Sequence, residues 1–190
     1  MTLVQLTTSE IEPVSLVDAK AHLRVDTNDE DLIIQALVAA ARERVESITN
    51  RAIVETTYRL ELPCWPASEV ITLPRPPLAS VDSVKYIDDA GTLQTLDAAT
   101  YQVTMPSGPR AERATVRPAY GLSWPSHRDQ PNAVQVTFTA GYGSACPAVV
   151  KAAILLLVTH LYEHRGDSAD GFPPAVTALL APYVSRGGRS

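Results

Sequence analysis

The sequence has little of what marks secreted, membrane-spanning or disulfide-stabilised proteins. Its 190 residues include only two cysteines, Cys64 and Cys146, which are too few for a disulfide scaffold and lack zinc-ligand spacing. The N-terminus has neither the basic nor the apolar region of a secretory signal. The longest apolar run, residues 152–158, is far shorter than a membrane span. We therefore expect a soluble cytoplasmic protein without membrane contacts.

Positive charge is also scarce. Sixteen lysines and arginines stand against 21 aspartates and glutamates, which gives a formal net charge of −5. No global positive field is available to hold nucleic acid through its phosphates. The rest of the composition is ordinary for a globular domain, with 45% apolar and 19% charged residues. The length suits one domain, or one domain with an insertion.

Proline usage and residue patterns divide the chain into three stretches. Residues 1–51 and 147–190 have patterns typical of helices, whereas residues 52–146 hold ten of the fifteen prolines and short runs typical of strands. We expect an α+β fold in which four helices, two from each end of the chain, form the core. The middle stretch is expected to be a small antiparallel β insertion.

The N-terminal stretch predicts two helices. Ser15, followed three residues later by Asp18, has capping-box spacing and starts a helix that runs to about Val25. Residues 32–48 place their apolar side chains on one helix face. Asn50 is expected to end this second helix.

The C-terminal stretch predicts two more helices. Pro147 suits the first turn of a helix that runs to about His164, and residues 152–158 within it are apolar on every face. Such a helix is either surrounded by its own domain or shared with a neighbouring subunit. A last helix is expected from Ala175 to about Val184, followed by a basic, glycine-rich tail.

Short strands are expected in the middle stretch. Residues 58–62 alternate apolar and polar side chains, which is typical of a half-buried strand. Residues 88–91, Asp-Asp-Ala-Gly, predict a hairpin turn. The expected strands are 58–62, 70–73, 81–87, 92–96, 101–105, 115–116 and 134–139, with exposed loops at 106–109 and 121–131.

One segment resembles a catalytic motif. His160-Leu161-Tyr162-Glu163-His164 matches an H-x-x-E-H pattern, in which two histidines bind zinc and the glutamate is a general base. Only Asp167 and Asp170 follow as candidates for the third, carboxylate ligand. The favoured alternative is a helix C-terminus whose imidazoles interact with the last carbonyls. We predict no catalytic residue, no metal and no cofactor.

Arginines and aromatic residues gather in the second half of the middle stretch. Such residues can grip single-stranded nucleic acid, but they also supply most hot spots of protein–protein interfaces. Because the chain is acidic overall, an interface or an ordinary loop is the favoured interpretation. The residues are Arg110, Arg113, Arg117, Tyr120, Trp124, His127 and Arg128.

Several segments, taken in order along the chain, resemble one known family. They are Pro13–Val25, Asp29–Ile33, Ala39–Glu46, Thr49–Ala52, Pro147–Arg165, Pro173–Val176 and Leu179–Tyr183. Their succession resembles the head–tail connector (adaptor) proteins of long-tailed bacteriophages and related prophage or gene-transfer particles, in the longer branch with a β insertion. The resemblance implies a non-enzymatic virion protein that forms a ring, most often of twelve copies, below the portal.

The resemblance also implies partners and a location. Such a ring extends the DNA channel, docks on the portal protein and offers a platform to a neck or tail-completion protein. Double-stranded DNA passes through without specific binding. The protein is therefore expected in the virion neck, after assembly in the host cytoplasm.

We assign candidate surfaces to this expected ring. The apolar helix suggests a subunit interface, the C-terminal segment suggests portal docking, and the acid-rich N-terminal stretch suggests a channel lining that repels phosphates. The predicted interface residues are Ile154, Leu155, Leu156, Val158 and Leu161; the docking residues are Leu180, Tyr183, Arg186 and Arg189; the channel-facing acids are Glu43 and Glu46.

Two other functions stay open at this point. One is a zinc-dependent hydrolase built on residues 160–164, and the other is an α+β adaptor module with an unrelated protein partner. A ring has a mass many times that of the 20.5 kDa chain, so a size measurement separates it from both. Measurement of bound zinc separates the hydrolase from the other two functions.

Overall fold

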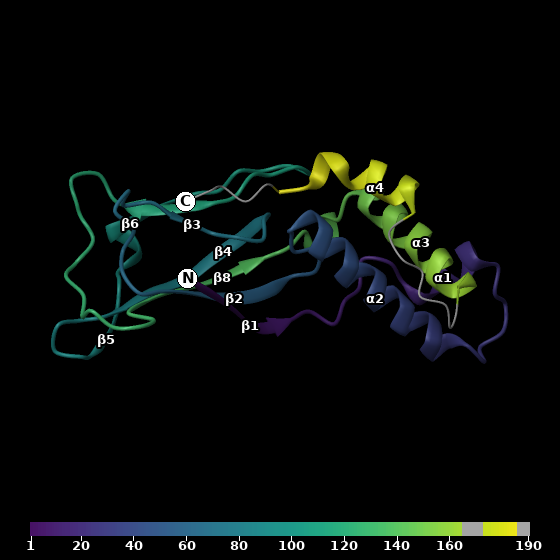
Figure 1. Cartoon of the computed structure of the whole chain (residues 1–190), viewed down its shortest axis with the longest axis horizontal. Coiled ribbons are helices and arrows are strands. Elements are labelled where there is room, and N and C mark those ends of the chain that lie inside the picture. Colours follow the sequence, from purple (N-terminus) through teal and green to yellow (C-terminus); the bar gives the residue numbers. More distant parts are fainter. Residues whose placement is uncertain (165–172, 186–190) are drawn as a thin grey trace. The chain divides into compact units, whose positions relative to one another are not determined.

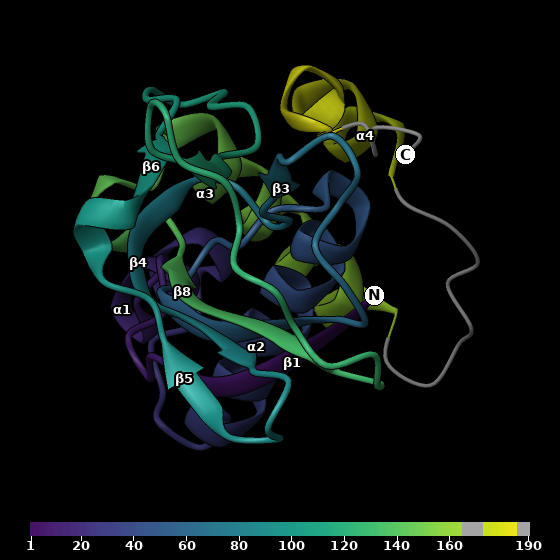
Figure 2. The same cartoon turned by 90° about the vertical axis from the view of Figure 1, so that its left-hand side faces the viewer.

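The computed structural model describes residues 1–164 and 173–185 and combines helices with antiparallel sheets (Figures 1 and 2). The expected α+β class is therefore confirmed. The chain divides into two compact units. The helical unit consists of residues 10–54 and 142–190, and the β unit consists of residues 1–9 and 55–141.

The described residues of the helical unit form four α-helices: α1 (Leu16–Leu23), α2 (Asp31–Thr49), α3 (Ala148–Glu163) and α4 (Pro174–Leu180). The predicted start of α1 and the predicted end of α2 are confirmed. The Asp18 backbone N–H donates to Ser15 Oγ over 3.1 Å at the start of α1. Asn50 ends α2 in a left-handed conformation with φ of 53°.

One apolar cluster fills the helical unit. The buried face of α2 presents Ile34, Val38, Ala41 and Val45, as the helical spacing predicts. Buried side chains of α3 and α4 belong to the same cluster, and Figure 1 shows α2 and α3 side by side. Each fully buried aliphatic side chain contributes about 1.5–3 kcal/mol. The cluster therefore holds the N-terminal and C-terminal parts of the helical unit together.

The last helix is shorter than predicted. We expected it to run to about Val184, but α4 ends at Leu180 and a 3-10 turn follows over Ala181–Tyr183. Pro182 explains the difference because it has no backbone N–H to donate to the preceding turn.

The β unit contains two antiparallel sheets. The larger sheet has the order β1-β2-β8-β4-β5 and the smaller one β3-β7-β6. Both views draw the smaller sheet on one side of the larger one (Figures 1 and 2). The strands are β1 (Thr2–Thr8), β2 (Thr56–Leu62), β3 (Ile71–Thr72), β4 (Leu78–Ile87), β5 (Leu93–Thr95), β6 (Tyr101–Thr104), β7 (Thr115–Pro118) and β8 (Val134–Ala140).

The edge strand β1 was not expected, since only helices were predicted in residues 1–51. It pairs with β2 in a register that joins Thr2 to Glu61 and Thr8 to Thr56. Its partner lies some fifty residues away, so no local sequence signal marks the pairing. The β unit is thus more than an insertion, because the start of the chain completes its larger sheet.

The predicted hairpin between β4 and β5 is confirmed. Gly91 N–H donates to the Asp88 carbonyl over 2.9 Å, and Thr92 N–H donates to Asp88 Oδ1 over 2.8 Å. Gly91 has a φ of +87°, which glycine adopts without steric cost. No helix within the described residues has the length and apolar character required to cross a bilayer.

Candidate assembly surfaces

Helix α3 has two different apolar faces. Ile154 and Val158, predicted to face a neighbouring subunit, are fully buried in the protomer's own core. That part of the prediction is wrong, because α2 and α4 already cover this side of the helix. Leu155 and Leu161 are half-buried against the same cluster. Leu156 is the one predicted interface residue with a substantially exposed side chain, at 37%.

Leu156 belongs to an exposed apolar row along α3. Val149 and Ala152 precede it at intervals of three and four residues and are also exposed. This spacing places all three on one side of the helix. Val149 and Ala152 were not predicted, because the sequence of a helix that is apolar on every face does not show which side the protomer covers.

The C-terminal segment is anchored inside the helical unit. Leu180 and Tyr183 are buried, which corrects their assignment to a portal-docking surface. Arg51 Nε donates to the Tyr183 carbonyl, and Ser185 N–H donates to the Thr49 carbonyl over 2.8 Å. These bonds tie the end of the last helix to the end of α2. Arg186 and Arg189, the other predicted docking residues, lie outside the described residues.

The two predicted channel-facing acids have different environments. The Glu43 side chain is 70% exposed, whereas that of Glu46 is 15% exposed. Glu46 accepts a hydrogen bond from Arg42 Nη1 over 3.0 Å and another from Ile53 N–H over 2.7 Å. Glu46 is therefore engaged in the fold, with little of its side chain exposed to solvent.

Arg42 is the centre of this buried charge cluster. Its Nε lies 3.0 and 3.2 Å from the two carboxylate oxygens of Glu12. Burial alone would lower the pKa of Arg42, but the hydrogen bond and charge of Glu12, together with the charge of Glu46, outweigh it and raise that pKa. The guanidinium consequently stays charged and holds the segment before α1 on α2.

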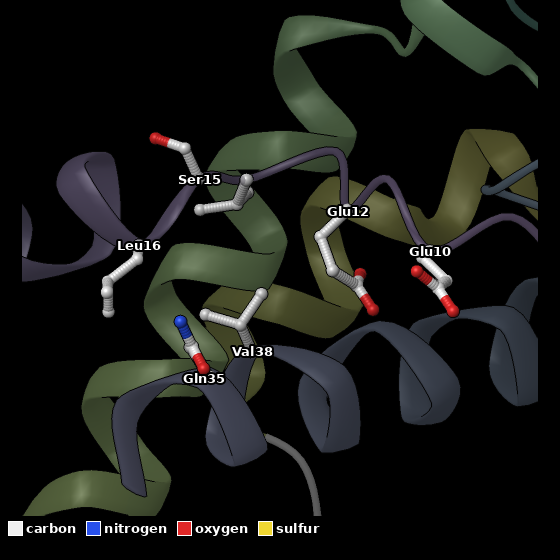
Figure 3. Close-up of a pocket in the computed structure, with 7 residues that line it drawn as sticks. Glu10, Glu12, Ser15, Leu16, Gln35 and Val38 are labelled. Atoms are coloured by element: carbon white, nitrogen blue, oxygen red, sulfur yellow. The ribbon is translucent and has the colours of Figure 1, made fainter. Parts of the chain in front are cut away.

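A pocket of about 470 Å³ opens beside this cluster, between the segment that leads into α1 and helix α2 (Figure 3). The Glu10 and Glu12 side chains extend toward α2, and Gln35 and Val38 rise from that helix. Glu12 accepts a hydrogen bond from Arg42. Ser15 lies at the other end of the pocket and caps α1. Because Glu12 and Ser15 already form hydrogen bonds within the chain, we assign no ligand to the pocket.

The histidines of the H-x-x-E-H segment interact with each other at the end of α3. The ring centroids of His160 and His164 lie 4.5 Å apart, and His164 Nδ1 is 2.9 Å from the His160 carbonyl. Both rings are thus part of the helix terminus, as the favoured interpretation predicts. Within residues 1–164 and 173–185, no three potential ligands cluster around a metal position.

The two cysteines have different environments. Cys64 is exposed in a loop, and Cys146 is buried next to the start of α3. Burial raises the pKa of the Cys146 thiol to about 11, although Lys151 opposes the shift. A thiol with this pKa is almost entirely protonated at neutral pH and is a poor nucleophile.

A family of known proteins resembles the N-terminal half of the chain, including α1 and α2. Residues 13–92 match the family model of phage gp6-like head-tail connector proteins. This range includes α1, α2 and the N-terminal segments on which the resemblance was based. The resemblance to head–tail connectors is confirmed. None of the curated proteins matches the chain.

Solved structures of gene transfer agent particles resemble the chain over its whole length. A chain in the neck of an empty GTA particle, computed with C6 symmetry, is 26% identical at a TM-score of 0.82. A chain in the virion of a native gene transfer agent (GTA) particle is 26% identical at a TM-score of 0.81. A chain in the neck of a native GTA particle, computed with C12 symmetry, shares the fold at 24% identity and a TM-score of 0.80. Each comparison covers 100% of this chain and 98% of the other.

Proposed function

We propose that this protein is a structural head–tail connector, a virion protein that acts by assembly and not by catalysis. The observation that carries the proposal is the likeness of the entire chain, at 26% identity, to a chain in a GTA neck. The family-model match over residues 13–92 supports the same role. In this proposal the protein resides in the virion neck after assembly in the host cytoplasm.

The copies form a ring, and the exposed row of α3 is one side of the contact between them. The C6 symmetry of the related neck supports a cyclic assembly, and twelve copies are compatible with it. Cyclic contacts join two different surfaces of the same chain. Val149, Ala152 and Leu156 supply the first surface. Exposed Leu32 and Ile33 of α2 supply apolar side chains for the second.

The ring lies between the portal protein and a neck or tail-completion protein, and DNA passes through it. A net charge of −5 disfavours retention of the duplex by its phosphates. Glu43 is the acid that we propose for the channel surface, because its carboxylate is exposed and Glu46 is engaged in the fold.

Cryo-electron microscopy of particles made with and without this gene tests the proposal. Particles that contain the protein should have a ring at the head–tail junction, into which the chain fits. Particles that lack it should lose the ring and their tails, and a plasmid copy of the gene should restore both. Complete necks in the absence of the gene would refute the proposed function.

A matched pair of variants tests the ring contact. Leu156→Glu places a charge in the exposed row of α3, whereas Leu93→Glu places one on β5, where the leucine is also exposed. The first variant should reduce the ring population in native mass spectrometry and in particles, and the second should not. Equal assembly of the two variants would exclude this row from the contact.

A further inference from the structure

A tight turn directly after β7 exposes Tyr120 to solvent. Leu122 N–H donates to the Ala119 carbonyl over 2.9 Å, and Gly121, the third residue of the turn, has a φ of +77°. This combination is typical of a type II turn, in which glycine occupies the left-handed position. Tyr120 is 99% exposed and Leu122 is 52% exposed. The turn therefore leaves two large apolar side chains unused by the fold.

Two tryptophans hold the loop after this turn. The rings of Trp65 and Trp124 are stacked, with centroids 4.4 Å apart and planes within 5°. Trp124 Nε1 donates to the Glu69 carbonyl over 3.0 Å, and Trp65 Nε1 donates to the Pro125 carbonyl over 2.9 Å. The loop is thus fastened to the segment that precedes β3, within the β unit.

Backbone bonds fix the loop at both of its ends. Ala119 N–H donates to the Thr100 carbonyl over 2.9 Å, just before Tyr120. Arg128 N–H donates to the Ile87 carbonyl over 2.9 Å at the far end. A surface that is ordered before binding loses little conformational entropy when a partner docks. An exposed tyrosine on such a support has the properties of an interface hot spot.

The turn lies in a stretch of the sequence that is rich in arginine. Residues 110–128 contain four arginines and a single carboxylate, Glu112, in a chain whose net charge is −5. Arg117, three residues before Tyr120, is exposed on β7. Tyrosine and arginine are enriched at protein interfaces. Complementary charge predicts a partner surface that carries carboxylates.

We propose that the Tyr120–Leu122 turn, with Arg117, docks a different protein of the neck, whose surface presents an apolar pocket bordered by carboxylates. Tyr120 and Leu122 fill the pocket, and Arg117 pairs with an acid at its rim. This inference rests on the proposed function, because it assigns the turn to contacts along the neck. In this assignment, the helical unit makes the contacts between copies of the chain.

Binding measurements with purified proteins test the assignment. The portal protein and the neck proteins encoded with this chain are immobilised separately, and the full-length chain is passed over each. One of them should bind wild type, and Tyr120→Ser should weaken the Kd at least tenfold. Arg117→Gln should weaken it several-fold and flatten its dependence on salt. Val17→Ser, which truncates an exposed valine of α1, is the control and should bind like wild type.

Other outcomes would overturn the inference. If Tyr120→Ser dissociates rings of the purified protein in sedimentation, the turn contacts a second copy. If a 30-nucleotide DNA binds wild type but not Tyr120→Ser, the turn contacts nucleic acid. A neck in which the ring is present and Tyr120 faces solvent refutes the docking assignment alone, whereas a neck without the ring refutes the proposed function itself.

Discussion

The helical unit and the β unit leave different kinds of apolar surface exposed. The helical unit exposes apolar side chains along regular helices, as in the Val149–Leu156 row of α3. The β unit exposes Tyr120 and Leu122 at a turn, while strand residues such as Val136 and Phe138 are fully buried. A row along a helix suits repeated packing against an identical copy, and a rigid projecting turn suits a pocket on another protein.

The two units also use polar groups differently. The helical unit contains buried arginines, Arg42 and Arg51, which bind carboxylates and a backbone carbonyl. The β unit anchors its long loop with the N–H groups of Trp65 and Trp124. Loss of a buried charge contact costs more than loss of a neutral hydrogen bond. We therefore expect larger single-residue effects in the helical unit.

The largest expected effect distinguishes the two faces of α3. Ile154→Ala should lower the free energy of unfolding by about 4 kcal/mol, because it opens a cavity in the core. Leu156→Ala should lower it by less than about 1 kcal/mol at a protein concentration where rings are dissociated. Urea titrations followed by circular dichroism at 222 nm measure both values. Similar losses for the two variants would contradict the division of α3 into a buried and an exposed row.

The next effect compares the two acids of α2. Glu46→Lys should destabilise the protein by about 3 kcal/mol, because it repels Arg42 and removes the acceptor of the Ile53 N–H. Glu43→Lys should change stability by no more than about 1 kcal/mol, since Glu43 is 70% exposed and its 3.5 Å contact with Arg42 is screened by solvent. Only Glu43→Lys thus gives folded particles in which retention of packaged DNA can be compared with wild type. Equal thermal shifts in the two variants would disprove the structural role of Glu46.

A smaller effect is expected at the anchor of the last helix. Arg51→Met should cost about 2 kcal/mol, because the buried carbonyl of Tyr183 loses its donor. Hydrogen–deuterium exchange should increase in residues 174–185. Arg24→Met, which removes an exposed arginine, serves as the control and should leave that exchange unchanged. Unaltered protection of residues 174–185 in Arg51→Met would show that the anchor is dispensable.

The smallest expected effect lies in the β unit. Trp124→Phe keeps an aromatic ring against Trp65 but removes the hydrogen bond to the Glu69 carbonyl, which should cost about 1 kcal/mol. Exchange should rise in residues 119–128. Tyr120→Ser should leave both stability and exchange at wild-type values, since the fold does not use this side chain. If Tyr120→Ser lowered the free energy of unfolding as much as Trp124→Phe does, the tyrosine would contribute to the fold and not only to its surface.

Local features of the sequence were sufficient to predict several elements. Ser15 with Asp18, Asn50 and the Asp88–Gly91 turn were predicted correctly, because each depends on bonds between residues close in sequence. Strand β1 was missed because its hydrogen bonds are made to β2, on the far side of two helices in sequence. The end of α4 was placed too late because the signal of Pro182 was overlooked.

The candidate surfaces were less predictable than the elements that carry them. Leu180 and Tyr183 have the apolar character of docking residues, but Arg51 and the helical core bury that segment. Glu46 and Glu43 lie three residues apart on one helix, and both contact Arg42, at 3.0 and 3.5 Å. The hydrogen bond from Ile53 N–H and the deeper burial of Glu46 distinguish them. Whether a side chain is available to a partner depends on contacts made by residues distant in the chain.

The sequence by itself determined the α+β class, the four helices, the strand-rich middle and the resemblance to connectors, because helix periodicity, caps and turns act over a few residues. The tertiary structure alone decided which row of α3 stays exposed, which acid is engaged in the fold and how the N-terminal strand completes the larger sheet. Burial is a property of packing between distant segments, and the same leucine or glutamate can be a core residue or a surface residue according to what covers it.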